Sequence, residues 1–212
     1  MAGSRFLDRV EAGRQLARVL LHHRGTGALV LGLPRGGVPV AAEVAAALDA
    51  ELDVLVVRKL GVPGHEELAM GAVAGGGLRV LNADVLSRLA LRHEVIEAAT
   101  DRAAAQVAAR EEAYRGDRAP LALRGRRVLL VDDGLATGAT MRVAVRAVTG
   151  AGASPVVVAV PVAPPSACEA LRALADEVVC LHTPSSFLAV GAWYDDFSET
   201  SDDEVRSLLG VG

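Results

Sequence analysis

The residues from Val128 to Thr140 read Val-Leu-Leu-Val-Asp-Asp-Gly-Leu-Ala-Thr-Gly-Ala-Thr. The apolar run predicts a buried strand, and two adjacent carboxylates follow where that strand ends. In an open parallel sheet, ligands bind at this edge. The glycine lets the backbone approach a ligand, and the free amides at the start of the following helix, with the threonine hydroxyls, favour an anion. The segment therefore predicts a site for a phosphorylated sugar.

The segments around this motif predict an α/β fold. A short apolar run, a helix and a second apolar run follow one another between Ala28 and Val57, and this order is a βαβ unit with a right-handed crossover. Asp8 and Glu11 predict the N-cap of a helix that ends near Arg24. Further strands are expected at 155–160 and 177–181, and further helices at 94–115, 140–149, 166–175 and 202–209. We expect one domain over 1–212, a parallel Rossmann-like sheet flanked by helices.

The stretch from Leu60 to Gly77 is rich in glycine and lacks sustained periodicity. A loop of this length inside a compact domain is typically a lid or a binding loop, so we expect a mobile loop here. His65, Glu66 and Glu67 lie within it. They could close over a substrate or transfer protons, or they could form a solvated loop tip, and the sequence leaves these alternatives open.

Composition excludes several classes of protein. A net charge of −4 disfavours a protein built to grip nucleic acid. The N-terminus has no apolar signal region, and no apolar stretch is long enough to span a bilayer, so we expect a soluble cytoplasmic protein. Of the 22 basic residues, only Lys59 is a lysine. It either marks a place where a compact ammonium is needed or is a chance surface residue.

The 13 residues quoted first resemble the signature of the type I phosphoribosyltransferases, with four apolar residues, two acids and a Thr-Gly-x-Thr turn. The resemblance covers the whole motif, and the order of elements extends it over most of the chain. It implies a small hood in addition to the main sheet. It also implies Mg²⁺ and phosphoribosyl pyrophosphate as ligands, a homodimer, and a role in nucleotide metabolism.

The resemblance also assigns roles to residues. Asp132 and Asp133 would hold the ribose hydroxyls and, directly or through those hydroxyls or water, the metal. The 5-phosphate cradle would be Ala136, Thr137, Gly138, Ala139 and Thr140. The turn Pro34-Arg35-Gly36-Gly37 would be the pyrophosphate loop. Lys59 and Arg35 would act catalytically by stabilising the charge that grows on the departing pyrophosphate.

Two positions depart from the family pattern. Gly134 stands where the family usually has an apolar residue, and we expect a looser strand end there. Ala136 stands where members that salvage oxopurines carry an aspartate proposed as the acid or base. Alanine cannot transfer a proton, which makes a hypoxanthine–guanine type of activity less expected.

Aromatic residues gather near the C-terminus. Four of the six lie between 187 and 197, among them Trp193, Tyr194 and Phe197. A flat base needs an aromatic face, so these three are candidates for the acceptor side. The alternative is that they fasten this segment to the core or to a partner subunit.

Three functions remain open at this stage. The first is an enzyme that transfers a phosphoribosyl group to an acceptor, such as a nucleobase, and releases pyrophosphate. The second is a regulator that binds phosphoribosyl pyrophosphate without turnover. The third is a hydrolase with water as acceptor, which a long lid disfavours. We favour the enzyme, because the chain has neither the basic charge nor the extra length that such regulators carry.

Overall fold

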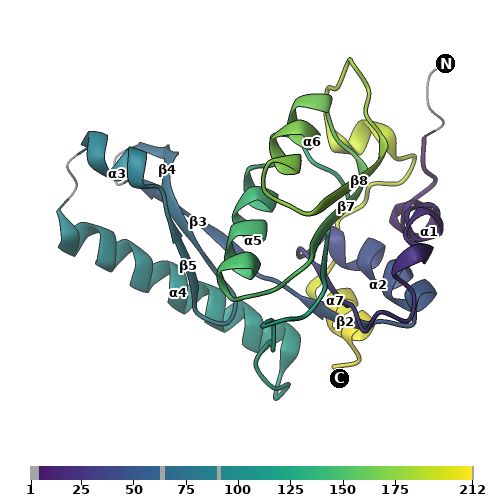
Figure 1. Ribbon diagram of the computed structural model, residues 1–212, viewed down its shortest axis with the longest axis horizontal. Coiled ribbons are helices and arrows are strands. Elements are labelled where there is room, and N and C mark those ends of the chain that lie inside the picture. Colours follow the sequence, from purple (N-terminus) through teal and green to yellow (C-terminus); the bar gives the residue numbers. More distant parts are fainter. Residues whose placement is uncertain (1–4, 63–64, 90–91, 212) are drawn as a thin grey trace.

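The computed structural model describes residues 5–62, 65–89 and 92–211, and the side chains of 65–69 and 83–84 lie outside the description. A five-stranded parallel sheet has the order β2-β1-β6-β7-β8, and a three-stranded antiparallel sheet lies beside it (Figure 1). The parallel strands are β1 (Leu29–Gly32), β2 (Glu51–Val54), β6 (Val128–Val131), β7 (Val156–Val162) and β8 (Glu177–His182). The predicted parallel α/β fold is confirmed.

Helices cover both faces of the parallel sheet. α1 (Arg9–Val19) and α2 (Gly37–Leu48) pack on one face, while α5 (Ala139–Gly150) and α6 (Pro165–Arg172) pack on the other. Side chains alternate between the two cores: Val128 and Leu130 of β6 point towards α5, whereas Leu129 and Val131 point towards α1 and α2. Because both faces are buried, the strand is apolar throughout, as a parallel sheet requires.

The N-terminal helix begins where the sequence predicts and ends earlier. The Asp8 carboxylate accepts a hydrogen bond from the Glu11 amide at 2.7 Å, which confirms the N-cap. α1 ends at Val19, and a short 3₁₀ turn, η1 (Leu21–His23), follows. The expected continuation of the α-helix to Arg24 is therefore wrong.

The segment expected to be a loop forms a sheet instead. β3 (Val57–Val62), β4 (His65–Ala74) and β5 (Leu78–Leu81) pair antiparallel beside α3 (Ala83–Leu89) and α4 (His93–Arg115). The glycines that suggested a loop have two structural uses. Gly76 and Gly77 adopt positive φ in the β4–β5 turn, and a Cβ on Gly71 would lie 2.5 Å from the Val80 carbonyl oxygen. The side chains of His65, Glu66 and Glu67 lie outside the described part of the structure.

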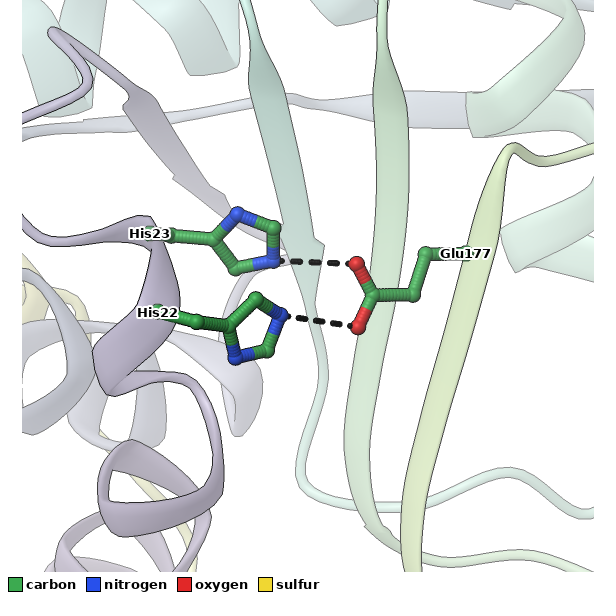
Figure 2. A group of neighbouring side chains, drawn as sticks. All are labelled: His22, His23 and Glu177. Carbon is green, nitrogen blue, oxygen red and sulfur yellow. Dashed lines mark hydrogen bonds and ion pairs between the residues drawn. The ribbon is translucent and has the colours of Figure 1, made fainter.

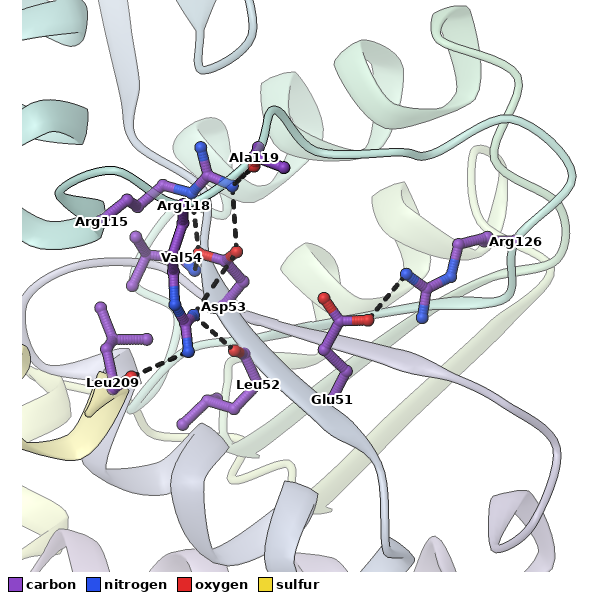
Figure 3. A network of polar contacts seen from close by, with 9 residues as sticks. All are labelled: Glu51, Leu52, Asp53, Val54, Arg115, Arg118, Ala119, Arg126 and Leu209. Carbon is purple, nitrogen blue, oxygen red and sulfur yellow. Dashed lines mark hydrogen bonds and ion pairs between the residues drawn. The ribbon is translucent and has the colours of Figure 1, made fainter. Parts of the chain in front are cut away.

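A buried ion-pair network fastens α4 to the parallel sheet (Figure 3). Arg115, near the end of α4, donates two hydrogen bonds to Asp53 of β2, at 2.9 and 3.1 Å. Arg118 donates to the carbonyl oxygens of Leu52 and Leu209, and so ties in the C-terminal helix α7 (Asp202–Leu209). The second apolar run that the sequence analysis identified, which extends to Val57, is divided between β2 and the start of β3, and the ion pair of Asp53 lies near the end of β2.

The segment just before α1 pairs with a segment that follows β8. Phe6 forms a parallel β-bridge with Tyr194, just after the 3₁₀ turn η2 (Val190–Trp193). The Phe6 amide donates to the Trp193 carbonyl, and the Asp195 amide donates to the Phe6 carbonyl, both at 2.8 Å. In the part of the chain that the structure describes, no helix is both long and apolar enough to cross a membrane.

Candidate functional site

Two loops meet at the carboxyl edge of the parallel sheet. β1 and β6 are neighbours, and the loops that follow them are Pro34–Gly37 and Asp132–Gly138. Contact between them is close: a Cβ on Gly36 would lie 2.1 Å from Asp133 Oδ2, and one on Gly37 would lie 2.9 Å from Asp132 Cα. The structure therefore brings together the predicted pyrophosphate loop and the acid pair, and both positions need glycine.

Each carboxylate of the acid pair has one oxygen anchored to the protein. Asp132 Oδ1 accepts from the Asp133 amide at 2.9 Å, and Asp133 Oδ2 accepts from Arg9 Nε at 2.8 Å. Among the described residues, no other residue bonds to Asp132 Oδ2 or Asp133 Oδ1. Two oxygens from neighbouring side chains thus remain available to a ligand, which suits a pair of adjacent hydroxyls or a hard cation.

Burial makes this acid pair energetically unfavourable in its ionised form. Burial raises the pKa of Asp132 well above its usual range, and the charge of Asp133 raises it further. Burial also raises the pKa of Asp133, while the hydrogen bond and charge of Arg9 lower it. A ligand that brings hydroxyl donors or positive charge to the free oxygens would stabilise the ionised carboxylates and so offset the cost of their burial.

The predicted phosphate turn forms an open helix N-terminus. Gly138 is the N-cap of α5 with φ +66° and has no side chain to cap the helix, although the Thr137 hydroxyl accepts from the Ala139 amide at 3.3 Å. Ala136 and Thr137 are exposed, and Thr140 is half-buried in the first turn of α5. Unpaired amides and the helix dipole at such an end favour an anion. Arg142 Nη1 donates to the Thr137 carbonyl at 2.9 Å, which adds a nearby cation that the sequence reasoning missed.

Gly134 packs tightly, contrary to the expected loosening of the strand end. Its φ of +157° lies at the limit of the range that favours glycine, and a Cβ there would lie 2.6 Å from Val190 Cγ1 and 3.0 Å from Val162 Cγ1. The next residue, Leu135, donates its amide to the Val162 carbonyl at 2.9 Å. The glycine is needed because the neighbouring strand and η2 leave no room for a side chain.

The two predicted cations lie in different surroundings. Arg35 is partly exposed and pairs with Glu199 and, at 3.7 Å, with Asp202. Lys59 is exposed on β3, opposite Ala72 of β4. Within the described residues, no hydrogen bond or ion pair joins Lys59 to the acid pair or to the glycine loop. Its catalytic role stays a prediction.

The three aromatic candidates are placed differently from one another. Tyr194 is buried, and its hydroxyl donates to the Asp133 carbonyl at 2.5 Å, so its ring offers no free face to a base. Trp193 is half-buried and stacks on His182, with ring centroids 5.5 Å apart. Phe197 is 38% exposed, and the Arg9 guanidinium carbon lies 4.0 Å from its ring centroid. An acceptor role remains open for Trp193 and Phe197.

Arg9 is a second site residue that the sequence analysis missed. It lies 124 positions before Asp133, so no local motif connects the two. The available signal was weak: an arginine at the first position of a helix, where acidic residues are favoured.

A second group of metal-ligand types lies at the opposite edge of the sheet. His22 Nε2 and His23 Nε2 each lie 3.1 Å from an oxygen of Glu177, the first residue of β8 (Figure 2). Arg127 Nη1 lies 3.1 Å from His23 Nδ1. Because arginine only donates hydrogen bonds, His23 Nδ1 must accept one, and the neutral ring therefore carries its proton on Nε2. This Nε2–H group lies near Glu177, but its direction does not meet the geometry of a hydrogen bond. A metal would need that nitrogen unprotonated, so this group fastens η1 to β8.

Comparison with known proteins agrees with this geometry. Residues 8–196 match the phosphoribosyl transferase domain family. Two Mycobacterium tuberculosis proteins, from strains CDC 1551 and H37Rv and provisionally named phosphoribosyl transferases, are each 50% identical over 204 residues, or 96% of this chain. The chain spans about half of their length, 46%.

A solved structure is similar over the whole fold. The protein TT1426 from Thermus thermophilus is 48% identical, with a TM-score of 0.88 and coverage of 97% of each chain. Nearly all of the fold of this chain is therefore already known from a crystal structure.

Proposed function

Since this chain belongs to the phosphoribosyl transferase domain family, we propose that it transfers the 5-phosphoribosyl group of phosphoribosyl pyrophosphate to an acceptor and releases pyrophosphate. One observation carries the proposal. Two carboxylates, each with one anchored and one free oxygen, lie between an open helix N-terminus and a glycine loop that touches them. The acid pair would match the ribose hydroxyls of a single ligand, the helix N-terminus its 5-phosphate, and the glycine loop its pyrophosphate.

Each part of the ligand has its own residues in this proposal. Asp132 Oδ2 and Asp133 Oδ1 accept from the ribose hydroxyls. Residues 136–140 bind the 5-phosphate through backbone amides and the hydroxyls of Thr137 and Thr140. The turn that contains Gly36 and Gly37 is proposed to face the departing pyrophosphate. Its donor would be the Gly36 amide, because the Gly37 amide already donates to the Leu33 carbonyl at 3.0 Å. The lack of side chains at both glycines lets the backbone come within contact distance of the acid pair.

The residues present also fit Mg²⁺. Free carboxylate oxygens are ligands that this ion accepts, either directly or through water. When bound, the ion would neutralise part of the negative charge on the departing pyrophosphate. Asp132 and Asp133 are the residues that would hold it.

The reaction requires mainly positioning and electrostatics from the protein. Positive charge develops on the ribosyl carbon and negative charge on the pyrophosphate as the bond between them breaks. Arg35 and Lys59 are proposed to stabilise the leaving group, and removal of one such group in other enzymes lowers the rate by about 10²–10³. Ala136 offers no group for proton transfer to the acceptor, so the acceptor would have to react without help at this position.

The acceptor is proposed to be a nucleobase or a related nitrogen compound. Phe197 contacts Arg9, which bonds to Asp133, and Trp193 precedes Tyr194, whose hydroxyl bonds to the Asp133 carbonyl. Both rings are partly exposed, and such rings can stack on a base. By family likeness, we further propose a cytoplasmic homodimer that serves nucleotide metabolism.

A direct assay tests the transfer. The protein is incubated with Mg²⁺ and phosphoribosyl pyrophosphate, nucleobases are added singly, and mass spectrometry detects nucleotides and pyrophosphate. We expect a nucleotide with at least one base. Binding without turnover on any acceptor would favour a sensor, and pyrophosphate release without a base would favour a hydrolase.

A further inference from the structure

Arg9 reaches the acid pair from the first turn of α1. Its Nε donates to Asp133 Oδ2 at 2.8 Å, and the two side chains are only 12% and 14% exposed. Gly36 borders the same contact, since a Cβ there would lie 3.1 Å from Arg9 Nε. The ion pair is thus enclosed between α1, the loop after β1 and the loop after β6.

The C-terminal segment 193–198 holds Arg9 in this position. The ring of Phe197 lies under the guanidinium, and Nη1 donates to the Ser198 carbonyl at 2.6 Å. The Tyr194 hydroxyl donates to the carbonyl of Asp133, so the same segment also fixes the backbone of that acid. Pairing of Phe6 with Tyr194 joins the segment to the residues just before α1.

Arg9 is not placed to stabilise its helix. The N-terminus of a helix carries a partial positive charge, and a cation in the first turn is unfavourable there. The position is explained by the contacts at the far end of the side chain. These contacts occupy Asp133 Oδ2 and leave Oδ1 without a bond from another residue of the described chain.

We propose that Arg9 is a positioning residue for the ribose: it holds one oxygen of Asp133 so that the other faces the sugar hydroxyls, and segment 193–198 locks it there. The proposal rests on the proposed function. It makes a specific claim about ligand parts, because Arg9 donates its hydrogen bond to the sugar-binding acid, whereas it only lies beside Gly36 of the pyrophosphate loop.

Isothermal titration calorimetry with separate ligand parts tests the proposal. Wild type and Arg9→Met are titrated with ribose 5-phosphate, phosphoribosyl pyrophosphate and inorganic pyrophosphate, each with Mg²⁺. Arg9→Met should weaken both ribose ligands by about tenfold or more, as expected for loss of a bond to a charged group. Pyrophosphate should bind both proteins within about twofold, a difference well under 1.4 kcal/mol.

A matched control lies on the same helix. Arg14 is exposed and pairs with Glu43 at 2.9 Å, away from the acid pair, so Arg14→Met should bind all three ligands as wild type does. Arg9→Lys keeps a charge and a donor and should recover part of the ribose 5-phosphate affinity. If Arg9→Met does not fold, Phe197→Leu replaces it, since loss of the ring should weaken ribose 5-phosphate and spare pyrophosphate.

The outcomes separate the two proposals. If wild type binds neither ribose ligand, the proposed function fails. If wild type binds them and Arg9→Met, or its replacement, binds ribose 5-phosphate equally or more tightly, only the role of Arg9 is overturned. Equal weakening of ribose 5-phosphate and pyrophosphate would also overturn it, because that pattern indicates a general disturbance of the site.

Discussion

At the scale of single residues, Asp132 and Asp133 differ in what surrounds their charge. Asp133 has Arg9 as a partner, whereas in the described part of the chain the Asp132 carboxylate is bonded only to a backbone amide. A folded-state pKa above the unfolded value stabilises the fold at low pH, and this contribution is lost as the pH rises through the folded pKa. At neutral pH, which lies well above the unfolded pKa, the burial of Asp132 therefore lowers the stability of the free protein relative to an uncharged side chain.

We expect Asp132→Asn to raise the melting temperature at neutral pH while it abolishes ribose 5-phosphate binding. For a chain of this size, each 1 kcal/mol of stability corresponds to about 2–4 °C. Asp133→Asn is the contrasting variant: it leaves Arg9 without its charge partner, so it should lose binding without a gain in stability. Calorimetric melting and ligand titration measure both effects. A lower melting temperature for Asp132→Asn would contradict the expectation.

His23 gives a prediction about acid sensitivity. Burial lowers its pKa below the ordinary value, and the charges of His22 and Arg127 lower it further, while Glu177 opposes them. A depressed folded-state pKa means that stability present above the unfolded pKa, about 6.5, is lost as the pH falls below that value and through the folded pKa. Wild type should therefore lose stability from pH 7.5 to about 5.5, in the range where histidine titrates.

The histidine responsible can be identified by substitution. His23→Gln should flatten this part of the dependence of melting temperature on pH. His93→Gln should leave it unchanged, because the His93 side chain is 81% exposed. Identical slopes for His23→Gln and wild type would show that His23 is not the group that titrates.

At the scale of elements, the junction of β2, α4 and α7 depends on one buried ion pair (Figure 3). Arg115→Met would leave Asp53, which is 3% exposed, without its main partner. Breaking a buried pair in this way costs about 3–5 kcal/mol. We expect a loss of this size in urea unfolding. Arg126→Met is the control, because Arg126 and Glu51 form a more exposed pair, and such pairs contribute about 0–1 kcal/mol. Equal effects of the two substitutions would contradict the expectation.

The elements that the sequence predicts well are those with a local cause. A continuous apolar run marks β6, and the acids and glycines after it place the phosphate turn directly. The antiparallel sheet was missed because its glycines resemble those of a loop, although Gly71 is needed for close approach of β5. Arg9 was missed because only the tertiary fold brings α1 to the end of β6. Similarly, the residue type of Tyr194 suggested that its ring stacks on a base, but the ring is buried and its hydroxyl bonds to the Asp133 backbone.

At the scale of the whole molecule, the parallel sheet and the antiparallel sheet carry different parts of the proposed chemistry. The parallel sheet presents the acid pair and both phosphate loops, and β3 of the antiparallel sheet carries Lys59. Since Lys59 is exposed, its loss should hardly change folding. A catalytic lysine near the pyrophosphate would instead affect turnover strongly.

Lys59→Ala should lower turnover by about 10²–10³ if its ammonium stabilises the leaving group. Its melting temperature should stay close to that of wild type. Turnover is measured as pyrophosphate release with the acceptor found in the base panel, and the melting temperature is measured by calorimetry. Full turnover would remove Lys59 from the mechanism, and a purely thermal effect would make it a structural residue.

The contact between Arg35 and Glu199 has a consequence for how the free protein meets ions in solution. The Arg35 guanidinium, which is proposed to bind the pyrophosphate, already forms an ion pair with Glu199, the residue just after segment 193–198. An incoming anion must exchange with that carboxylate and does not meet a bare cation. Inorganic phosphate, which would bind through this one contact, would compete poorly with Glu199 for the Arg35 guanidinium. A ligand that is also bound elsewhere at the edge of the sheet could displace Glu199. Glu199 thus acts as an internal competitor that disfavours the binding of small anions to Arg35.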